Sequence, residues 1–376
     1  MKISDIDPNL KVPETLDLPD LRWLDARSGE FVLYGTRVDD PGEPFRRLPA
    51  DVAESVNEGV AFLARNTAGL RLRFRTDSPY VALHAEWDTQ CCFSHMPVSG
   101  VCGFDLYRVI RGTDPDPEPG SGRGTDPGPE YAGTFIPPFS SPSGFESVLA
   151  TPGGMQDFIL NFPLYNDVSR LYIGVSESAR FEAPAKYRPV LPIVYYGSSI
   201  TQGGCASRPG NAYQSMLSRT LDVDFINWGF SGSARGEETM VKHIAATPMS
   251  IFVCDYDHNA PDAAHLEATH FAVYKTVRDA NPDLPIILLS KPDVRTIHPQ
   301  VYKENMRRRD IVRDTYERAV NTGDRHVYYI DGYSLFADDD PQSATVDGCH
   351  PGDLGFHYYR LALEPILRKL LTELEN

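Results

Sequence analysis

The sequence has no long apolar run: none of its stretches approaches the roughly 20 apolar residues that a membrane-spanning helix requires. Residues 1–8 also lack the charged and then apolar pattern of a secretion signal, so we expect a cytoplasmic protein without a membrane partner. Basic side chains are scarce, with 36 Lys and Arg against 52 Asp and Glu, and the formal net charge is −16. Because an acidic surface repels nucleic-acid phosphates, this balance argues against nucleic acid as a partner.

Cysteine is scarce as well, with six residues in the whole chain, and no two of them have the C-x-x-C spacing of zinc sites and redox motifs. In a chain without a secretion signal we expect all six to be free thiols. The acidic pair Asp255 and Asp257 follows an apolar run and resembles a metal site, but we do not assign it one. We therefore expect neither a metal nor a bound cofactor.

The first half of the chain is rich in β-forming residues. Residues 20–185 show no helical periodicity and contain short runs of β-branched and aromatic residues between turn signals. Residues 70–75 alternate apolar and basic side chains, which predicts a half-buried strand with its basic face in solvent. Residues 112–130 are dominated by Pro, Gly and acidic side chains and predict a mobile loop. Residues 1–185 are thus predicted to form an all-β, jelly-roll-like sandwich.

The character of the chain changes near residue 188. Helical patterns now alternate with short apolar runs, at 190–196, 223–228, 249–254, 285–290 and 326–330. Such a succession predicts a parallel five-stranded sheet with helices on both faces, a three-layer doubly wound α/β domain. We place this domain at residues 188–376, after a linker near 180–190.

The candidate nucleophile is Ser199, which comes after the first of these apolar runs, behind Gly197 and Ser198. The carboxyl ends of parallel strands share one edge of the sheet, and α/β proteins bind their ligands there. Taken alone, Gly-Ser-Ser is more often a plain turn. The assignment therefore depends on which residues stand at the carboxyl ends of the other strands.

Asp347 and His350 come after the last strand on one short loop and complete a predicted catalytic triad with Ser199. A serine hydroxyl needs a base to take its proton, and imidazole can do so near neutral pH. A carboxylate three residues earlier can hold the imidazole in the required tautomer. Singly, Asp347 could instead cap the last helix, and His350 could be an ordinary loop histidine.

A negative oxygen forms in acyl transfer and must be stabilised. Three donors after the first three strands are candidates for this oxyanion hole: the amides of Ser199 and Gly232 and the side chain of Asn259. His258 is the alternative to Asn259 as the residue that faces the site. Aromatic side chains crowd the same edge, and we expect an acyl pocket lined by Trp228, Phe230 and Tyr256.

These residues resemble the sequence blocks of the SGNH, or GDSL-type, hydrolases and acyltransferases. The likeness rests on Gly197-Ser198-Ser199-Ile200, on Gly232, on Asn259 and on the spacing of Asp347, His350 and Pro351. Ser198 stands where the family usually has aspartate, and the third block departs from the usual Gly-x-Asn-Asp. Residues 103–107, Gly-Phe-Asp-Leu-Tyr, resemble the β-sandwich module that precedes some SGNH domains.

The resemblance implies an SGNH hydrolase fold and serine acyl transfer through an acyl-enzyme. It leaves open whether water or a hydroxyl group takes the acyl group. The layout is similar to enzymes that tailor natural products of the antibiotic kind, which implies an O-acyltransferase with an aryl acyl group and acyl-coenzyme A as co-substrate. A carbohydrate O-acetylesterase is the first alternative, and a glycan-binding protein with an inactive SGNH fold is the second. The acceptor and the oligomeric state are left open.

Overall fold

A computed structural model describes residues 16, 18–38, 40, 44–110, 128–292, 297–336 and 341–375. The loop predicted at 112–130 lies almost wholly outside these described residues, since only its last three positions are included. Among the helices of this part of the chain, none combines the length and apolar character needed to cross a bilayer.

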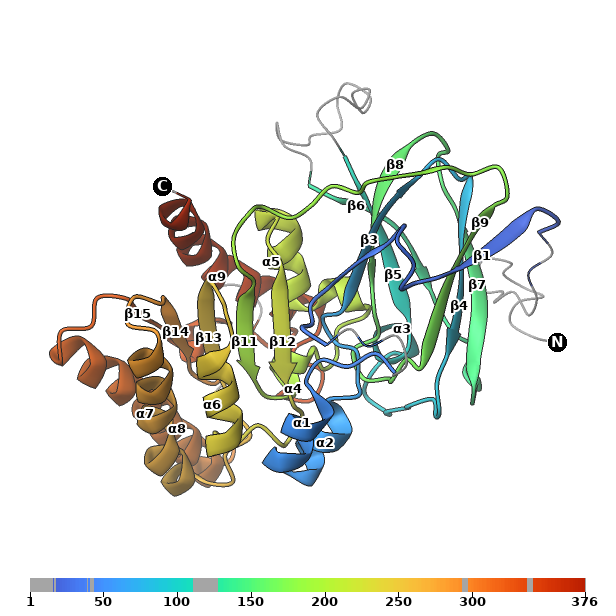
Figure 1. Ribbon diagram of the computed structural model, residues 1–376. Helices are drawn as coiled ribbons and strands as arrows, with labels where there is room; N and C mark the ends of the chain where they lie inside the picture. Colours follow the sequence, from blue (N-terminus) through green and yellow to red (C-terminus); the bar gives the residue numbers. More distant parts are fainter. Residues whose placement is uncertain are drawn as a thin grey trace.

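The amino-terminal domain is a sandwich of two antiparallel sheets (Figure 1). The outer sheet has the strand order β1 (Leu21–Asp25), β9 (Arg170–Ser176), β4 (Tyr80–Glu86), β7 (Gly144–Ala150). The inner sheet has the order β10 (Phe181–Glu182), β3 (Arg71–Thr76), β8 (Gln156–Asn161), β5 (Phe104–Val109), β6 (Glu130–Phe135), and β2 (Val32–Tyr34) pairs with β3. The inner sheet faces the second domain, and the predicted all-β architecture is confirmed.

The carboxy-terminal domain contains the predicted five-stranded parallel sheet. Its order is β12 (Phe225–Gly229), β11 (Ile193–Gly197), β13 (Ile251–Asp255), β14 (Ile286–Leu289), β15 (Val327–Ile330). One face is covered by α5 (Tyr213–Leu221) and α9 (Asp353–Leu374), and the other by α6 (Glu238–Ala246), α7 (Ala263–Ala280) and α8 (Pro299–Asn321). The sheet is buried on both faces, which explains why its strands are continuous apolar runs in the sequence.

Short helices also occur in residues 20–185, where the sequence shows no helical periodicity. Those among the described residues of this range are α1 (Ala50–Val56), α2 (Glu58–Leu63) and α3 (Val98–Val101). Each is shorter than the window over which helical periodicity can be recognised. Helix α1 contacts α6, and Val60 of α2 is buried in one cluster with Ile226 of the parallel sheet. Residues of the first half therefore pack on the core of the second.

The basic face of β3 is buried, and the prediction that it faces solvent is wrong. Arg71 and Arg73 have exposed fractions of only 1% and 3%. Their guanidinium groups form ion pairs with Asp224 and Asp222 of the carboxy-terminal domain. Arg71 also lies over the ring of Phe225, 3.8 Å from its centroid. Strand β3 does alternate apolar and basic side chains. Its basic face is covered by the second domain, because acidic and aromatic groups of that domain bind the guanidinium groups.

Arg47 is a second buried cation between the two halves of the chain, with an exposed fraction of 1%. It donates to the carbonyl oxygens of Leu63 and Asn66, both at 2.7 Å, on its own side. Across the interface it donates to the carbonyls of Asn227 at 2.9 Å and Gly229 at 2.8 Å. Burial lowers the pKa of Arg47 to about 9, so the side chain remains charged at neutral pH. Arg47 thereby fixes the end of β12.

Asp257 is a buried carboxyl group just beyond β13, with an exposed fraction of 1%. Its Oδ2 accepts a hydrogen bond of 2.7 Å from the backbone N–H of Lys291. Burial raises the pKa of Asp257 to about 6, although this bond and the nearby cationic side chains of Lys291 and Arg308 act in the opposite direction. The native protein therefore holds a proton at Asp257 that the unfolded chain releases at lower pH.

Replacing Arg47 with Met should lower the free energy of unfolding by on the order of 3–5 kcal/mol, because methionine fills the space but leaves buried carbonyl groups without donors. Urea denaturation measures the loss. The matched control is Arg37→Met, since the exposed Arg37 donates a long hydrogen bond of 3.4 Å to the carbonyl of Pro248; we expect a change within about 0.5 kcal/mol there. Equal losses in the two variants would contradict the role of Arg47.

Replacing Asp257 with Asn should flatten the pH dependence of stability between about pH 4 and 6. In the wild type the folded-state pKa, about 6, is above that of the unfolded chain, near 3.9. The native state thus binds more protons in this window, and its unfolding free energy falls as the pH rises, by on the order of 3 kcal/mol. Urea midpoints at several pH values measure the slope. Parallel curves for wild type and Asp257→Asn would show that Asp257 is not the group responsible.

Candidate active site

The nucleophile candidate is presented by a sharp change from strand β11 to the short helix α4 (Ser199–Gln202). Ser198 caps this helix with its hydroxyl oxygen, which explains how serine can stand at this position. Glycine is required nearby: a Cβ on Gly229 at the end of β12 would lie 2.1 Å from the backbone N of Gln202. A Cβ on Gly197 would likewise meet the backbone of β13, 2.5 Å from its last carbonyl oxygen. Helix α4 can therefore lie directly on the carboxyl edge of the sheet and place Ser199 there.

The structure brings Ser199, His350 and Asp347 together. Ser199 Oγ lies 2.9 Å from His350 Nε2, and His350 Nδ1 lies 2.7 Å from Asp347 Oδ2. The exposed fraction of Ser199 is 8%, whereas the side chains of His350 and Asp347 are 22% and 37% exposed. A proton can pass from the serine hydroxyl to the imidazole, and the site can be reached from solvent.

Asp347 is held in its ionised form. Partial burial acts to raise its pKa, but this effect is outweighed by hydrogen bonds from the backbone N–H groups of His350 and Cys349, at 2.8 and 3.0 Å, and by the imidazole itself. The pKa of Asp347 falls to about 2 as a result. The carboxylate can accept a hydrogen bond from the Nδ1–H group, so that the proton of the neutral ring stays on Nδ1 and Nε2 is free to act as a base toward Ser199.

The two other oxyanion candidates lie together on the loops after β12 and β13. The N–H of Gly232 donates to Asn259 Oδ1 at 3.1 Å, and Asn259 Nδ2 donates to the carbonyl of Phe230 at 2.7 Å. A carboxamide carries two N–H groups, so Asn259 retains one for a ligand. Gly232 would have to turn its N–H away from Asn259 to reach an oxyanion. Ser199 adds the first N–H of α4, which a helix leaves without an internal partner.

His258 has a different environment from Asn259. Its Nδ1 lies 3.8 Å from the sulfur of Cys349, on the loop that carries His350. Burial lowers the pKa of His258 well below 6.5, and the neighbouring positive charges of Lys291 and His350 act in the same direction. The imidazole is therefore neutral and packs behind the loop of Asp347 and His350, whereas the amide of Asn259 contacts the candidate oxyanion loop.

The prediction that three aromatic residues line an acyl pocket is wrong. Trp228, Phe230 and Tyr256 have exposed fractions of 1%, 0% and 0% and belong to the core beneath the sheet. Their polar atoms are used internally: Trp228 Nε1 donates to the carbonyl of Arg47 at 3.0 Å, and the Tyr256 hydroxyl bonds to Thr269 at 2.8 Å. These aromatic side chains fill the core, because helices cover both faces of the sheet.

Instead, side chains of the sandwich lie beside the triad. The hydroxyl of Tyr165 donates to the backbone carbonyl of Ser199 at 3.1 Å. The ring of His95 lies 5.6 Å from that of His350, and Phe93, with an exposed fraction of 39%, lies 5.5 Å from the ring of Tyr165. Sequence reasoning missed these residues, since no local pattern shows which loop of one domain meets an edge of another.

The Gly-Phe-Asp-Leu-Tyr segment holds a loop of the catalytic domain. Asp105 is fully buried and accepts hydrogen bonds of 2.8 Å from the N–H of Gly210 and from Asn161 Nδ2. A Cβ on Gly210 would lie 2.5 Å from the hydroxyl of Tyr107, so only glycine allows this approach. Arg208 completes the contact, 3.4 Å from both Asp105 and Tyr107. The motif thus positions the loop after α4.

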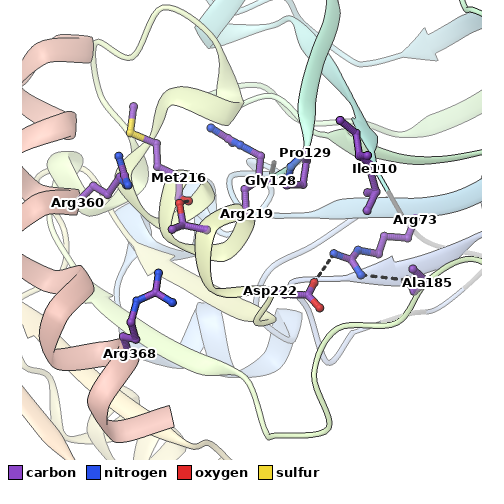
Figure 2. A pocket seen from close by; sticks show the side chains of 12 residues that line it. Arg73, Ile110, Gly128, Pro129, Ala185, Met216, Arg219, Asp222, Arg360 and Arg368 are labelled. Atoms are coloured by element: carbon purple, nitrogen blue, oxygen red, sulfur yellow. Dashed lines mark hydrogen bonds and ion pairs between the residues drawn. The ribbon is translucent and has the colours of Figure 1, made fainter. Parts of the chain in front are cut away.

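A cavity of about 720 Å³ lies away from the triad, between the sandwich and helices α5 and α9 (Figure 2). Arginines from three elements line it: Arg73 from β3, Arg219 from α5, and Arg360 and Arg368 from α9. Asp222 pairs with Arg73 at its edge. Neither Ser199 nor His350 is among the described residues of its wall, so this cavity is distinct from the site of the triad.

Two family models match the chain. The GDSL-like lipase/acylhydrolase family matches residues 191–368, and the amino-terminal module of SGNH-hydrolase-type esterases, named for its Gly-x-Asp-Leu-Tyr motif, matches residues 21–114. No curated protein matches the chain in sequence.

Several solved structures share the whole two-domain arrangement. A protein described as a GDSL-like lipase, from Bacteroides ovatus ATCC 8483, is 27% identical with a TM-score of 0.81, covering 94% of this chain and 98% of its own. The salicylyl-acyltransferase SsfX3 from a tetracycline biosynthetic pathway is 18% identical with a TM-score of 0.73 and the same coverage, 94% and 98%. A family two carbohydrate esterase from Clostridium thermocellum, in complex with cellohexaose, is 13% identical with a TM-score of 0.59, covering 91% and 99%.

The last two likenesses are of fold alone, because their sequence identities are low. The family matches agree with the order in which the Ser199, Gly232, Asn259 and Asp347–His350 segments occur in the sequence. The fold agrees with the prediction that these segments lie at the carboxyl edge of the parallel sheet. The chain is thus an enzyme whose residues 191–368 match the GDSL-like lipase/acylhydrolase family and whose residues 21–114 match the Gly-x-Asp-Leu-Tyr module of SGNH-type esterases.

Proposed function

We propose that the protein transfers an acyl group through an acyl-enzyme formed on Ser199, most simply from an acyl thioester to a hydroxyl group. The observation that carries this proposal is the chain of two short contacts, 2.9 Å from Ser199 to His350 and 2.7 Å from His350 to Asp347. In this mechanism Ser199 is the nucleophile, His350 the general acid and base, and Asp347 the group that orients the imidazole.

Formation of the acyl-enzyme begins with proton transfer from Ser199 Oγ to His350 Nε2. The oxygen attacks the carbonyl carbon of the donor, and the C=O bond becomes a C–O⁻ that the amides of Ser199 and Gly232 and the side chain of Asn259 would stabilise. Each such donor typically contributes roughly 3 kcal/mol to lowering the barrier. The bond from carbon to the leaving sulfur or oxygen then breaks, and His350 returns the proton to the leaving group.

The second half of the reaction, in which the acyl group leaves Ser199, repeats these steps in reverse. A hydroxyl of the acceptor gives its proton to His350, attacks the acyl carbon, and displaces Ser199 Oγ, which regains a proton from the imidazole. Water in place of the acceptor gives a hydrolase. The same three residues serve both outcomes, so the identity of the acceptor depends on how well water is excluded.

The acyl group that we propose is aromatic and the donor a coenzyme A thioester, which places the reaction in the cytoplasm where such thioesters occur. Support comes from the fold shared with a salicylyl-acyltransferase of a tetracycline pathway, and from the part-exposed ring of Phe93 near the triad. An aromatic acyl group could pack on that ring at favourable edge-to-face or offset geometry. The acceptor would then be a hydroxyl of a natural product.

Deacetylation of carbohydrates is the second candidate function. It is supported by the likeness in fold to family two carbohydrate esterases, one of which was solved with cellohexaose. A glycan-binding protein without activity is a third possibility, but the contacts among Ser199, His350 and Asp347 speak against it.

Mixing the protein with a salicylyl thioester of N-acetylcysteamine should add one acyl mass, measured by intact mass spectrometry over time. We expect the adduct in wild type and none in Ser199→Ala, because the hydroxyl is its site. A lasting adduct that a hydroxyl acceptor discharges indicates a transferase, and one that decays to free acid indicates an esterase. The same assay with an acetyl thioester and with acetylated xylan tests the carbohydrate candidate.

The necessary control is Cys349→Ser, since a thiol on the same loop could be acylated in place of the serine. This variant should still form the adduct. If Ser199→Ala is acylated as fast as wild type, or Cys349→Ser is not acylated, the assignment of the nucleophile is wrong.

Asp347→Asn should reduce kcat by about 100- to 10,000-fold, because an amide opposite Nδ1 favours the wrong imidazole tautomer. The Asn side chain retains an oxygen for the N–H groups of Cys349 and His350, so the loop should stay folded. Hydrolysis of p-nitrophenyl acetate measures the rate, and thermal unfolding checks the fold. A loss smaller than about threefold with an unchanged melting temperature would contradict the role of Asp347.

A further inference from the structure

His350 has two neighbours that the mechanism does not use. His95 comes from the segment between β4 and α3 in the sandwich, and Cys205 comes from the loop after α4. One ligand atom from each of the three residues, an imidazole nitrogen or the sulfur, lies within 4.8 Å of the other two. Three segments that are far apart in the sequence thus bring two imidazoles and a thiol to one point beside Ser199.

This donor set is one that Zn²⁺ prefers. Zinc binds imidazole nitrogen and thiolate sulfur at about 2.0–2.3 Å in a tetrahedral arrangement, so that its ligand atoms lie roughly 3.5 Å apart. The separations, none above 4.8 Å, need to contract by at most about 1.3 Å to match that spacing. Borderline and soft divalent ions share this preference, whereas Mg²⁺ and Ca²⁺ require oxygen ligands.

Asp347 gives His350 the carboxylate partner that zinc-binding histidines usually have. Imidazoles that bind zinc usually donate the other ring N–H to a carboxylate, which fixes the tautomer and aims the free nitrogen at the metal. His350 Nδ1 makes this contact with Asp347 at 2.7 Å. The arrangement that prepares Nε2 to take a proton from Ser199 therefore prepares it equally well to bind a metal ion.

Cys205 is held close to His95 by its local structure. Its exposed fraction is 6%, its sulfur lies 3.6 Å from the carbonyl oxygen of His95, and its φ angle of 72° is one that non-glycine residues rarely adopt. The adjoining loop is held by two carboxylates, through Gly210 on Asp105 and Ser207 on Asp353. The sulfur is thus held near the two imidazoles before any metal binds.

We propose that His95, Cys205 and His350 form an inhibitory site for zinc or a similar thiophilic divalent cation, and that its occupation stops acyl transfer. On binding, the thiol of Cys205 releases its proton to solvent and the thiolate coordinates the ion; nothing is oxidised or reduced. His350 Nε2 gives its lone pair to the metal and cannot accept the proton of Ser199. The effect on activity rests on the proposed function, but the binding itself does not.

Binding is tested without catalysis. Zn²⁺ titrated into the wild type, in a buffer free of competing thiols, should give one site per chain by calorimetry, and Co²⁺ in its place should give thiolate-to-cobalt absorption. Cys205→Ser and His95→Ala should each weaken Zn²⁺ binding at least about 10-fold, and Cys205→Ser should abolish the absorption. The matched control is Cys349→Ser, which should bind as wild type does. Absence of binding, or loss in Cys349→Ser with retention in Cys205→Ser, overturns the site.

Inhibition is measured separately, as the Zn²⁺ concentration that halves p-nitrophenyl acetate hydrolysis, with each variant compared with its own metal-free rate. This concentration should rise at least about 10-fold in Cys205→Ser and His95→Ala, and EDTA should restore the wild-type rate. Stoichiometric binding that leaves the rate unchanged overturns the inhibition. Failure of the proposed function is distinguishable, because it would appear as the absence of a Ser199 adduct before any metal is added.

Discussion

The burial of cations between the two domains is the constraint on which the rest of the structure depends. Arg47, Arg71 and Arg73 are all nearly inaccessible to solvent, and each is satisfied by carbonyl or carboxylate groups of the other half of the chain. A buried guanidinium without partners costs several kcal/mol, so the two surfaces must supply matching groups where they meet. The sandwich and the α/β domain therefore form one unit, although their sequences differ in character.

This interface also builds the active site. Arg47 holds the end of β12, from which the loop of Gly232 begins, and Gln202 of α4 bonds both to Asn66 of the sandwich half and to the N–H of Ser231. Tyr165 supports the backbone of Ser199 from the sandwich side. Asp105 of the Gly-x-Asp-Leu-Tyr segment then positions the loop that carries Cys205. The module thus supports the backbone of the candidate triad, and precise placement of a nucleophile would need such rigid support.

The chemistry of His350 is a consequence of how it is held. A carboxylate on Nδ1 and an open Nε2 make a general base, and the same two features make a good metal ligand. The two uses are distinguished by the third group near Nε2. Ser199 offers a hydroxyl 2.9 Å from Nε2, while Cys205 and His95 offer a thiol and an imidazole nitrogen within 4.8 Å of a ring nitrogen of His350. A proton and a metal ion therefore compete for one nitrogen.

The sequence by itself determined the fold class, because strands buried on both faces must be apolar runs and strands with one buried face must alternate. It also determined which residues stand at the carboxyl edge of the parallel sheet, and that rule identifies Ser199, Asp347 and His350. Only the tertiary structure decided what covers each surface. Alternation in β3 could not show that Arg71 and Arg73 would face Asp224 and Asp222 instead of water. Nor could residue type show that Trp228 and Tyr256 lie in the core while His95 and Cys205 lie beside the triad, since contacts between distant segments depend on how the two domains dock.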